Sequence, residues 1–364
     1  MLLESTKQSF LPLVRLGIGH SVDTLPETIE WEAMRALAEA QGLDAVVLDG
    51  VLALSERGEL TDGRSLDMQL KVQWIHTVIH NYEEQYEDYQ KRISQLAGFY
   101  NKHGFKLMIL KGYGLSLNYP VPNHRPCGDI DTWAFGHYKE ADATLSRELD
   151  IPIEQNHHHH TVYYFRGYRV ENHFDFVNVH YGHRNHELEK VLKEQAQDDS
   201  CFVEVNGQRV FLPSANLHAL FLLRHTLSHF AAVQMILRQA LDWGFFIEKH
   251  TAEIDWAWMQ KVMAEFKMTR FFCCLNAICV EDLGFDSRLF PEAQFEDPLK
   301  ERVLNDILVP EFDGHSPKKR LRRIFFKYRR WQANAWKQIL CYGDNRYKAL
   351  VQGIWSHLLK PSSI

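Results

Sequence analysis

Two aspartates stand two residues apart in the segment Gly128-Asp129-Ile130-Asp131, and they constrain this chain more than any other feature. Residues i and i+2 of a β-strand point to the same face, so both carboxylates are expected side by side. Like charges at that spacing repel each other unless a cation lies between them. Carboxylate oxygens suit Mg²⁺, which usually also binds phosphate oxygens of a substrate. The pair therefore predicts metal-dependent chemistry on a nucleotide; the alternative is a solvated strand end.

Positive charge and glycine surround the aspartates in the sequence. Lys111 and Arg125 supply the charge that a triphosphate requires. We assign nucleotide binding to these two residues together with Gly112 and Gly128. A lone Asp-x-Asp occurs by chance in many chains, so the prediction depends on the whole combination of residues at this spacing.

The run Leu110-Lys111-Gly112, Tyr119-Pro120, Arg125 and Gly128-Asp129-Ile130-Asp131 resembles the uncharacterised nucleotidyltransferase family of the DNA-polymerase-β-like nucleotidyltransferase superfamily. The resemblance covers residues 105–212 and continues more weakly into the following helices. It implies that the paired aspartates hold divalent ions, Mg²⁺ or Mn²⁺, and that a third carboxylate on a neighbouring strand completes the site. The superfamily usually has Gly-Ser before the pair, whereas this chain has Gly112-Tyr113. The amides around Gly112 and Gly114, with Lys111, would then hold the phosphates.

The segment from Thr161 to Phe176 is predicted to be a β-hairpin, because Arg166-Gly167 interrupts a run of aromatic and β-branched residues. On its second strand Glu171, His173 and Asp175 alternate onto one face. Three ionisable groups on one face are costly to bury without partners, which favours a site. The resemblance includes a Val-Glu-x-His element, which implies that Glu171 is the third carboxylate and a metal ligand. Asp175 is the second choice.

The resemblance also implies a reaction. Glu171 would accept the proton of an acceptor hydroxyl, which then attacks the α-phosphate of an NTP while pyrophosphate leaves. His173 either orients Glu171, contacts the acceptor, or is an ordinary strand histidine. A nucleotide- or metabolite-binding module without catalysis is the alternative function, because the turn at Gly112 lacks the serine.

Helical patterns surround these strands, which predicts an α+β fold. The resemblance implies a polymerase-β-like nucleotidyltransferase core, a mixed sheet with helices, flanked by helical regions. We expect an N-terminal helical region over residues 1–104, the catalytic core over 105–213 and a C-terminal helical region over 214–364.

Local signals predict the individual elements of these regions. Pro26 and the acidic residues after it indicate a helix start, and residues 64–103 have the spacing of one long helix or two. We expect strands over residues 105–110 and 127–135 and a helix over 138–149. Asn206-Gly207 predicts a hairpin over residues 202–212.

Histidines recur outside the hairpin. His225 and His229 lie four residues apart on a predicted helix, where they share a face. We favour hydrogen bonds to the core or to a substrate over metal binding there, because no glutamate completes a zinc motif. The run of four histidines at positions 157–160 is either a second metal site, a phosphate contact or a solvent-facing loop, and we favour the loop.

Eight basic residues lie among the thirteen between Lys318 and Arg330, interleaved with apolar ones. The segment is either a nucleic-acid-binding stripe, a membrane-surface helix, or the charged face of a helix whose apolar face packs inward. The net charge of −6 favours the third interpretation, since general nucleic-acid binders are usually basic.

The remaining composition is typical of an ordinary soluble globular protein. The six cysteines show no zinc spacing and are expected to be reduced. No export signal or membrane-spanning apolar run is evident in the sequence, so a cytoplasmic location is expected. The sequence names neither the NTP, such as ATP, nor the hydroxyl-bearing acceptor.

Overall fold

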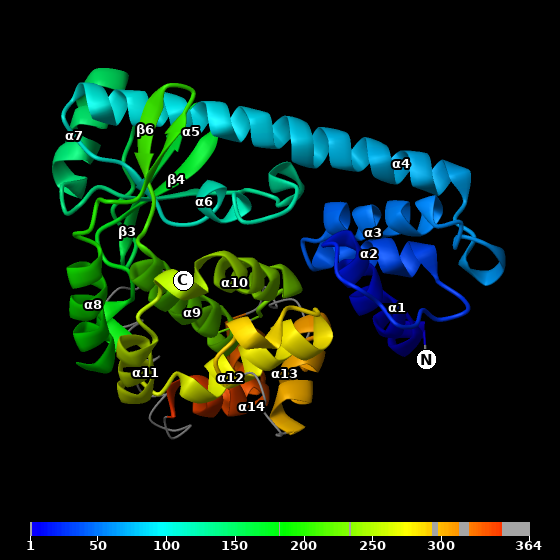
Figure 1. The fold of residues 1–364 in the computed structure, drawn as a ribbon. Helices are drawn as coiled ribbons and strands as arrows, with labels where there is room; N and C mark the ends of the chain where they lie inside the picture. Colours follow the sequence, from blue (N-terminus) through cyan, green and yellow to red (C-terminus); the bar gives the residue numbers. More distant parts are fainter. Residues whose placement is uncertain (1, 182, 233, 293–297, 313–319, 344–364) are drawn as a thin grey trace.

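The computed structural model describes residues 2–181, 183–232, 234–292, 298–312 and 320–343. Its centre is a six-stranded sheet with the strand order β3-β4-β2-β1-β6-β5. The strands are β1 (Met108–Ile109), β2 (Ile130–Trp133), β3 (His160–Phe165), β4 (Tyr168–His173), β5 (Phe202–Val205) and β6 (Gln208–Phe211). β2 runs parallel to β4 and antiparallel to β1, so the sheet is mixed. With many helices around it, this sheet confirms the predicted α+β fold (Figure 1).

Two tight hairpins form the ends of the sheet. Both turn residues of each hairpin have positive φ: 49° and 93° at Arg166-Gly167, and 48° and 77° at Asn206-Gly207. Two-residue turns of this kind match the twist of antiparallel strands. The predicted hairpins are therefore confirmed, although the first ends at His173 rather than Phe176. The predicted strands over residues 105–110 and 127–135 are likewise shorter than expected.

The sheet separates two hydrophobic clusters. Alternating residues of the strand at β1 belong to different clusters: Leu107 and Ile109 to one, Met108 and Leu110 to the other. The first cluster includes side chains of α5 (Glu84–Lys102) and α7 (Tyr138–Leu149), and α7 has the predicted bounds. The second includes Trp133 and side chains of α9 (Ala215–Ala232) and α10 (Leu237–His250). The face of the sheet that carries Trp133 therefore turns toward α9 and α10.

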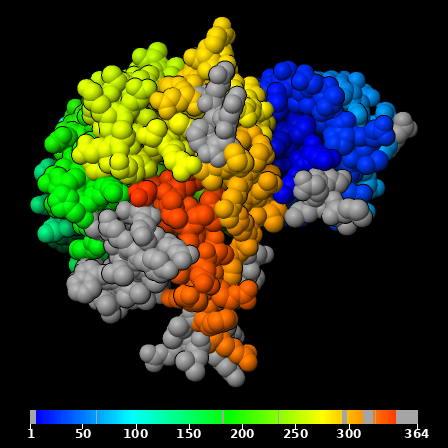
Figure 2. Space-filling view, turned by 90° about the horizontal axis from the view of Figure 1, so that it is seen from below, coloured from blue at the N-terminus to red at the C-terminus, as the bar shows by residue number. Residues whose placement is uncertain are grey.

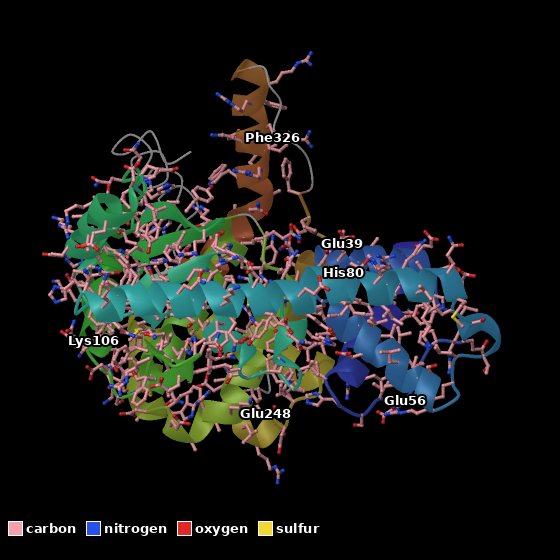
Figure 3. All side chains as sticks on the ribbon, turned by 90° about the horizontal axis from the view of Figure 1, so that it is seen from above. Glu39, Glu56, His80, Lys106, Glu248 and Phe326 are labelled. Atoms are coloured by element: carbon pink, nitrogen blue, oxygen red, sulfur yellow. The ribbon has the colours of Figure 1, made fainter. Side chains whose placement is uncertain are left out.

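One long helical run connects the sheet to the N-terminal helices (Figure 3). It consists of α4 (Met68–Val78), a π-helical turn η2 (Ile79–Glu83) and α5. At its far end lie α1 (Leu2–Gly17), α2 (Trp31–Ala40), α3 (Asp44–Glu56) and the 3-10 turn η1 (Asp62–Arg64). The helix expected to start at Pro26 begins only at Trp31, and Glu30 before it makes no side-chain capping hydrogen bond.

A half-buried histidine joins the N-terminal helices to the core. His124 lies in the 3-10 turn η3 (Pro122–His124), before the aspartate pair. Its Nδ1 is 2.7 Å from Asp49 Oδ2 of α3, and its Nε2 is 3.1 Å from Glu83 Oε1 of η2. Because of these two carboxylates, the loop that leads to β2 is attached to both helical elements.

Further helices lie between the two hairpins and after α10. Between the hairpins lie η4 (Val179–Tyr181) and α8 (His183–Gln195). After α10 come η5 (Thr251–Glu253), α11 (Trp256–Glu265), α12 (Thr269–Ala277), the π-helical η6 (Ile278–Asp282), η7 (Ser287–Leu289), α13 (Pro298–Leu308) and α14 (Arg320–Tyr342). None of the helices in the described ranges is both apolar and long enough to cross a membrane.

The last described helix, α14, has two unlike halves. Its C-terminal half is attached to the core: Lys337 and Asp306 of α13 form a fully buried ion pair, and Gln338 donates to the carbonyl of Ala231 in α9. Its N-terminal half stands away from the body of the molecule (Figures 2 and 3). Phe325 is 63% exposed and Tyr328 48% exposed.

The expectation that the apolar face of the basic segment packs inward is therefore wrong for Phe325 and Tyr328. Lys318 and Lys319 lie outside the described residues. The nucleic-acid and membrane interpretations of this segment stay predictions.

Candidate functional site

Two carboxylates lie side by side on neighbouring strands at the centre of the sheet. The register of the parallel pair β2 and β4 sets Asp131 opposite Glu171 and Trp133 opposite His173. The side chain of Asp131 is only 7% exposed, and that of Glu171 is 14% exposed. A carboxylate on the strand next to the Asp-x-Asp segment is the arrangement that the family resemblance implies for Glu171.

Asp129 does not share the strand of Asp131. It lies at a bend just before β2, and its side chain is 47% exposed. The expectation that both aspartates lie within one strand is therefore wrong, since β2 begins at Ile130. Asp129 still belongs to the same site, because Arg169 donates to its Oδ2 over 2.8 Å and also to Glu171 Oε1.

Arg169 is a site residue that the sequence analysis missed. Burial lowers its pKa, but Glu171 and Asp129 outweigh that effect and raise it above the ordinary value, so the guanidinium is charged. Its signal in the sequence is its position two residues before Glu171, on the same strand face. Because its guanidinium contacts both carboxylates, it reduces the repulsion between them.

Lys111 neutralises the second aspartate. Its Nζ lies 2.8 Å from Asp131 Oδ1. Burial alone would raise the pKa of Asp131, but Lys111 and His173 hold it well below the usual range. Asp131 is therefore ionised at neutral pH, and it is paired with a cation in a place that water barely reaches.

The turn after Lys111 requires glycine for a steric reason. Gly112 has φ +55° and ψ −107°, and a Cβ there would lie 2.3 Å from Tyr89 Oη. The Tyr89 hydroxyl donates to the carbonyl oxygen of Asp129 over 3.1 Å. Tyr89 of α5 therefore packs against Gly112 and holds the backbone at Asp129 beside it. Tyr113, in place of the usual serine, is buried and its hydroxyl accepts from Gln90.

Arg125 is engaged with a helix far away in the sequence. Its Nε and one terminal nitrogen donate to both oxygens of Asp242 in α10, over 2.7 and 2.9 Å. The guanidinium is 5% exposed, and Tyr119 also donates to Asp242. Arg125 also lines the smaller of the two cavities described below, but its principal partner is Asp242. Arg238, one turn earlier on α10, lines both cavities described below.

The predicted histidine pair of α9 faces the aspartates. His225 Nε2 is 3.0 Å from Lys111 Nζ, and His229 Nε2 is 3.2 Å from His225 Nε2. Burial lowers the pKa of His225 well below its usual value, and Lys111 lowers it further. A neutral His225 accepts a hydrogen bond from the Lys111 ammonium and so helps direct that ammonium toward Asp131.

His173 and part of the histidine run also lie at the site. His173 Nε2 is 3.3 Å from Asp131 Oδ1, while its Nδ1 is 3.2 Å from the carbonyl oxygen of Asp175. Burial and neighbouring histidines lower the pKa of His159 to about 3 and that of His160 to about 2, so both are neutral. The expectation of a solvent-facing loop is wrong for these two residues.

Asp175 is directed elsewhere. Its carboxylate pairs with Lys193 of α8, and it lines neither of the two cavities. β4 ends at His173, so the strand alternation that was expected to bring Asp175 beside Glu171 stops two residues too early. Glu171 is therefore the carboxylate of this hairpin that meets Asp131.

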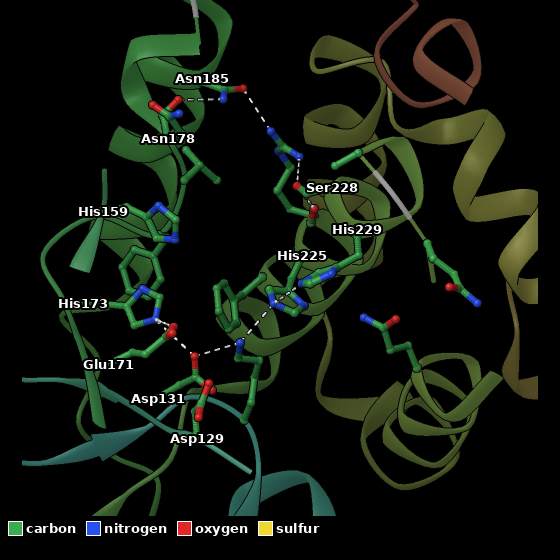
Figure 4. Close-up of a pocket in the computed structure, with 18 of the residues that line it drawn as sticks. Asp129, Asp131, His159, Glu171, His173, Asn178, Asn185, His225, Ser228 and His229 are labelled. Atoms are coloured by element: carbon green, nitrogen blue, oxygen red, sulfur yellow. Dashed lines mark hydrogen bonds and ion pairs between the residues drawn. The ribbon is translucent and has the colours of Figure 1, made fainter. Parts of the chain in front are cut away.

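Two cavities meet at the aspartates. The larger, about 670 Å³, extends from Asp131, Glu171 and His173 to α8 and α9 (Figure 4). Its far wall carries Asn185 and Arg224, which are hydrogen-bonded to each other, and the Arg224 partner Ser228. The smaller, about 320 Å³, lies on the side of the Gly112 turn, where Gly128 also lines it. A Cβ on Gly128 would meet open space, so no packing contact requires glycine there.

The donor atoms at this junction fit a divalent cation. Single oxygens of Asp131 and Glu171 and a ring nitrogen of His173 all lie within 4.8 Å of one another. Carboxylate oxygens suit Mg²⁺ and Mn²⁺, and Mn²⁺ also accepts imidazole nitrogen. Asp129 is not a member of this group and is connected to it through Arg169.

Three comparisons with known proteins bear on the family of this chain. No protein with a curated functional description matches the chain. An antigenic nucleotidyltransferase-like protein from Paracoccidioides brasiliensis has a similar solved structure, with 16% identity and a TM-score of 0.34 over 55% of this chain and 95% of that one. A family model described as uncharacterised nucleotidyltransferase matches residues 27–284, which is most of the chain. The chain therefore belongs to the uncharacterised nucleotidyltransferase family.

Proposed function

We propose that this protein transfers a nucleoside monophosphate from an NTP to a hydroxyl group of an acceptor and releases pyrophosphate. One observation carries the proposal: Asp131 and Glu171 lie opposite each other on β2 and β4, where two cavities meet. A reaction between two substrates requires two adjoining spaces and a group at their junction that stabilises developing charge.

The smaller cavity suits the triphosphate. Lys111, Arg238 and the backbone of the Gly112 turn line it, and they offer positive charge and amide donors. A Mg²⁺ or Mn²⁺ ion held by Asp131 and Glu171, with Asp129 at the edge, would supply further positive charge beside the phosphates when it is bound. Arg125 supports this wall through Asp242.

The larger cavity suits the acceptor. It has apolar walls, including Phe176 and Phe221, and polar groups on Arg224 and Asn185 that could orient hydroxyls or a negative charge. Glu171 borders it and would accept the hydroxyl proton. The acceptor oxygen then forms a bond to the α-phosphorus while the bond from that phosphorus to the β-bridging oxygen breaks, and pyrophosphate leaves with that electron pair.

Calorimetric titration with each of the four NTPs, with and without Mg²⁺, tests the donor site. We expect wild-type protein to bind one NTP preferentially and only with Mg²⁺, and the Asp131→Asn variant to lose most of that binding. Asp175→Asn is the matched control, because Asp175 belongs to the same hairpin but is directed toward Lys193. Unchanged binding by Asp131→Asn would refute the assignment.

A binding module without transfer is the second candidate, since the Arg169 guanidinium already contacts two of the three carboxylates. Release of pyrophosphate in the presence of a library of hydroxyl compounds separates the two functions. We expect release by wild type and Asp175→Asn but not by Glu171→Gln. Metal-dependent NTP binding with no release from any mixture would favour the binding module.

A further inference from the structure

Three histidines converge at the open end of the hairpin β3-β4. His160, the first residue of β3, is the direct antiparallel partner of His173, the last residue of β4. His159 precedes them, and its carbonyl oxygen accepts from the backbone nitrogens of Phe174 and Asp175, over 3.0 and 3.1 Å. The backbone therefore holds all three positions before any ligand arrives, which lowers the entropy cost of assembling a site.

Their ring nitrogens are close together, and within the described ranges those of His160 and one of His159 lack a hydrogen-bond partner, whereas His173 contacts Asp131 and the carbonyl of Asp175. One nitrogen from each of His159, His160 and His173 lies within 4.8 Å of the other two. Among the described residues, neither nitrogen of His160 nor Nδ1 of His159 has a hydrogen-bond partner, although these atoms are buried. His160 is 7% exposed as a whole. A buried polar atom without a partner typically costs about 1–3 kcal/mol, so this arrangement is costly unless something binds there.

We propose that His159, His160 and His173 bind a divalent transition-metal ion, Zn²⁺ in the first place. Three imidazoles are a ligand set that suits Zn²⁺ and not Mg²⁺, which prefers oxygen. Coordination would satisfy the buried nitrogens that hydrogen bonds leave without partners. Glu171 Oε2 lies 3.7 Å from His160 Nδ1 and 3.9 Å from His173 Nε2, and it supplies negative charge beside the cation.

This histidine site differs from the carboxylate site but adjoins it. His173 is common to both groups, whereas His159 and His160 belong only to the histidine site and Asp131 only to the carboxylate site. The proposal does not depend on nucleotidyl transfer, since it is tested by metal binding alone. His158 of the same run is a natural control, because its ring lies beside His180 with 6.0 Å between the ring centroids.

The test is Co²⁺ and Zn²⁺ binding by untagged full-length protein, purified without nickel resin and stripped with chelator. We expect one tightly bound ion per chain, an intense visible Co²⁺ spectrum typical of a nitrogen-rich four-coordinate site, and displacement of Co²⁺ by Zn²⁺. His159→Gln and His160→Gln should each weaken Zn²⁺ binding by more than about tenfold, since loss of an outer partner of a ligand alone costs about 10–100-fold. His158→Gln should leave it within about twofold, and Asp131→Asn, which changes only a hydrogen-bond partner of His173, should weaken it less than the two histidine variants do.

Two results would overturn the proposal. If His158→Gln weakened binding as much as His160→Gln, the run would act as a flexible chelator without a defined site. If Asp131→Asn abolished binding while the two histidine variants retained it, the ion would occupy the carboxylate site instead. Thermal melting of each metal-free variant shows whether it folds. His159 lines the larger cavity, so His159→Gln disturbs the core less than His160→Gln does.

Discussion

Replacing Gly112 by alanine tests the packing that positions Lys111 and Asp129. A Cβ at position 112 would lie 2.3 Å from Tyr89 Oη, and the backbone there has φ +55° and ψ −107°. Holding a residue other than glycine in such a sparsely populated conformation costs about 1–3 kcal/mol. Tyr89 must also move, and its hydrogen bond to the Asp129 carbonyl is worth about 0.5–1.5 kcal/mol. We expect Gly112→Ala to lower the free energy of unfolding by about 2–4 kcal/mol.

A double-mutant cycle with Tyr89→Phe identifies the cause. The single Tyr89→Phe change removes only the hydroxyl and its hydrogen bond, so it should cost about 1 kcal/mol. The double variant Gly112→Ala/Tyr89→Phe has no Tyr89 hydroxyl, so the clash with the new Cβ is removed. The hydrogen bond from Tyr89 to Asp129, which each single change disrupts, is lost only once in the double variant. The double variant should therefore be more stable than the sum of the single effects predicts, by about 1 kcal/mol or more.

Urea unfolding followed by tryptophan fluorescence measures each free energy, and NTP calorimetry on the folded variants reports the site. The control is Gly128→Ala, because a Cβ there meets nothing within 4 Å and should leave stability nearly unchanged. Additive effects of Gly112→Ala and Tyr89→Phe would refute the steric argument, since independent sites typically add to within about 0.5 kcal/mol.

Two ion pairs give pH-dependent predictions. Burial raises the pKa of Asp242, but Arg125 lowers it below the ordinary value of 3.8. The ion pair therefore stabilises the fold above pH 3.8, and this stabilisation is lost as the pH falls through the folded pKa. Asp242→Asn should lower the free energy of unfolding by about 3–5 kcal/mol at pH 7 and by less in acid, which urea unfolding at both pH values measures. Burial lowers the pKa of His124, but Asp49 and Glu83 raise it above 6.5, so its stabilisation is complete below pH 6.5 and is lost as the pH rises through the folded value. Wild type should therefore lose more stability than His124→Gln between pH 6 and pH 9, and equal losses in thermal melts would contradict this.

Local signals predict the hairpins because their causes are local. Asn206-Gly207 and Arg166-Gly167 adopt positive φ, and any chain with that turn must reverse there. The strands beside them are shorter than predicted. A strand ends where its hydrogen-bonded neighbour ends, even when the residues beyond that point still have high β-propensity. β1 is only two residues long although the apolar run around it is longer.

Contacts between distant elements could not be predicted in the same way. Arg125 and Asp242 are separated by 117 positions, and nothing near Arg125 indicates that α10 packs against it. The sequence therefore suggested phosphate as the partner of this arginine. The histidine run misled for a related reason: consecutive polar residues usually lie in solvent, but His160 starts β3, and its pairing with His173 brings it inside.

The register of β2 and β4 explains why the two aspartates, which look equivalent in the sequence, have different surroundings. With Asp131 opposite Glu171, continuing the parallel register back by two residues sets Asp129 beside Arg169. β4 thus presents a guanidinium to the first aspartate and a carboxylate to the second, and Asp129 and Arg169 indeed form an ion pair. Asp131 lies beside Glu171 and His173 of β4, neither of which supplies it with a permanent positive charge. Its cationic partner is Lys111, which belongs to neither β2 nor β4. Under the proposed function, a divalent ion at this site would therefore be bound chiefly by Asp131 and Glu171, and Asp129 and Arg169 would set the charge at its edge.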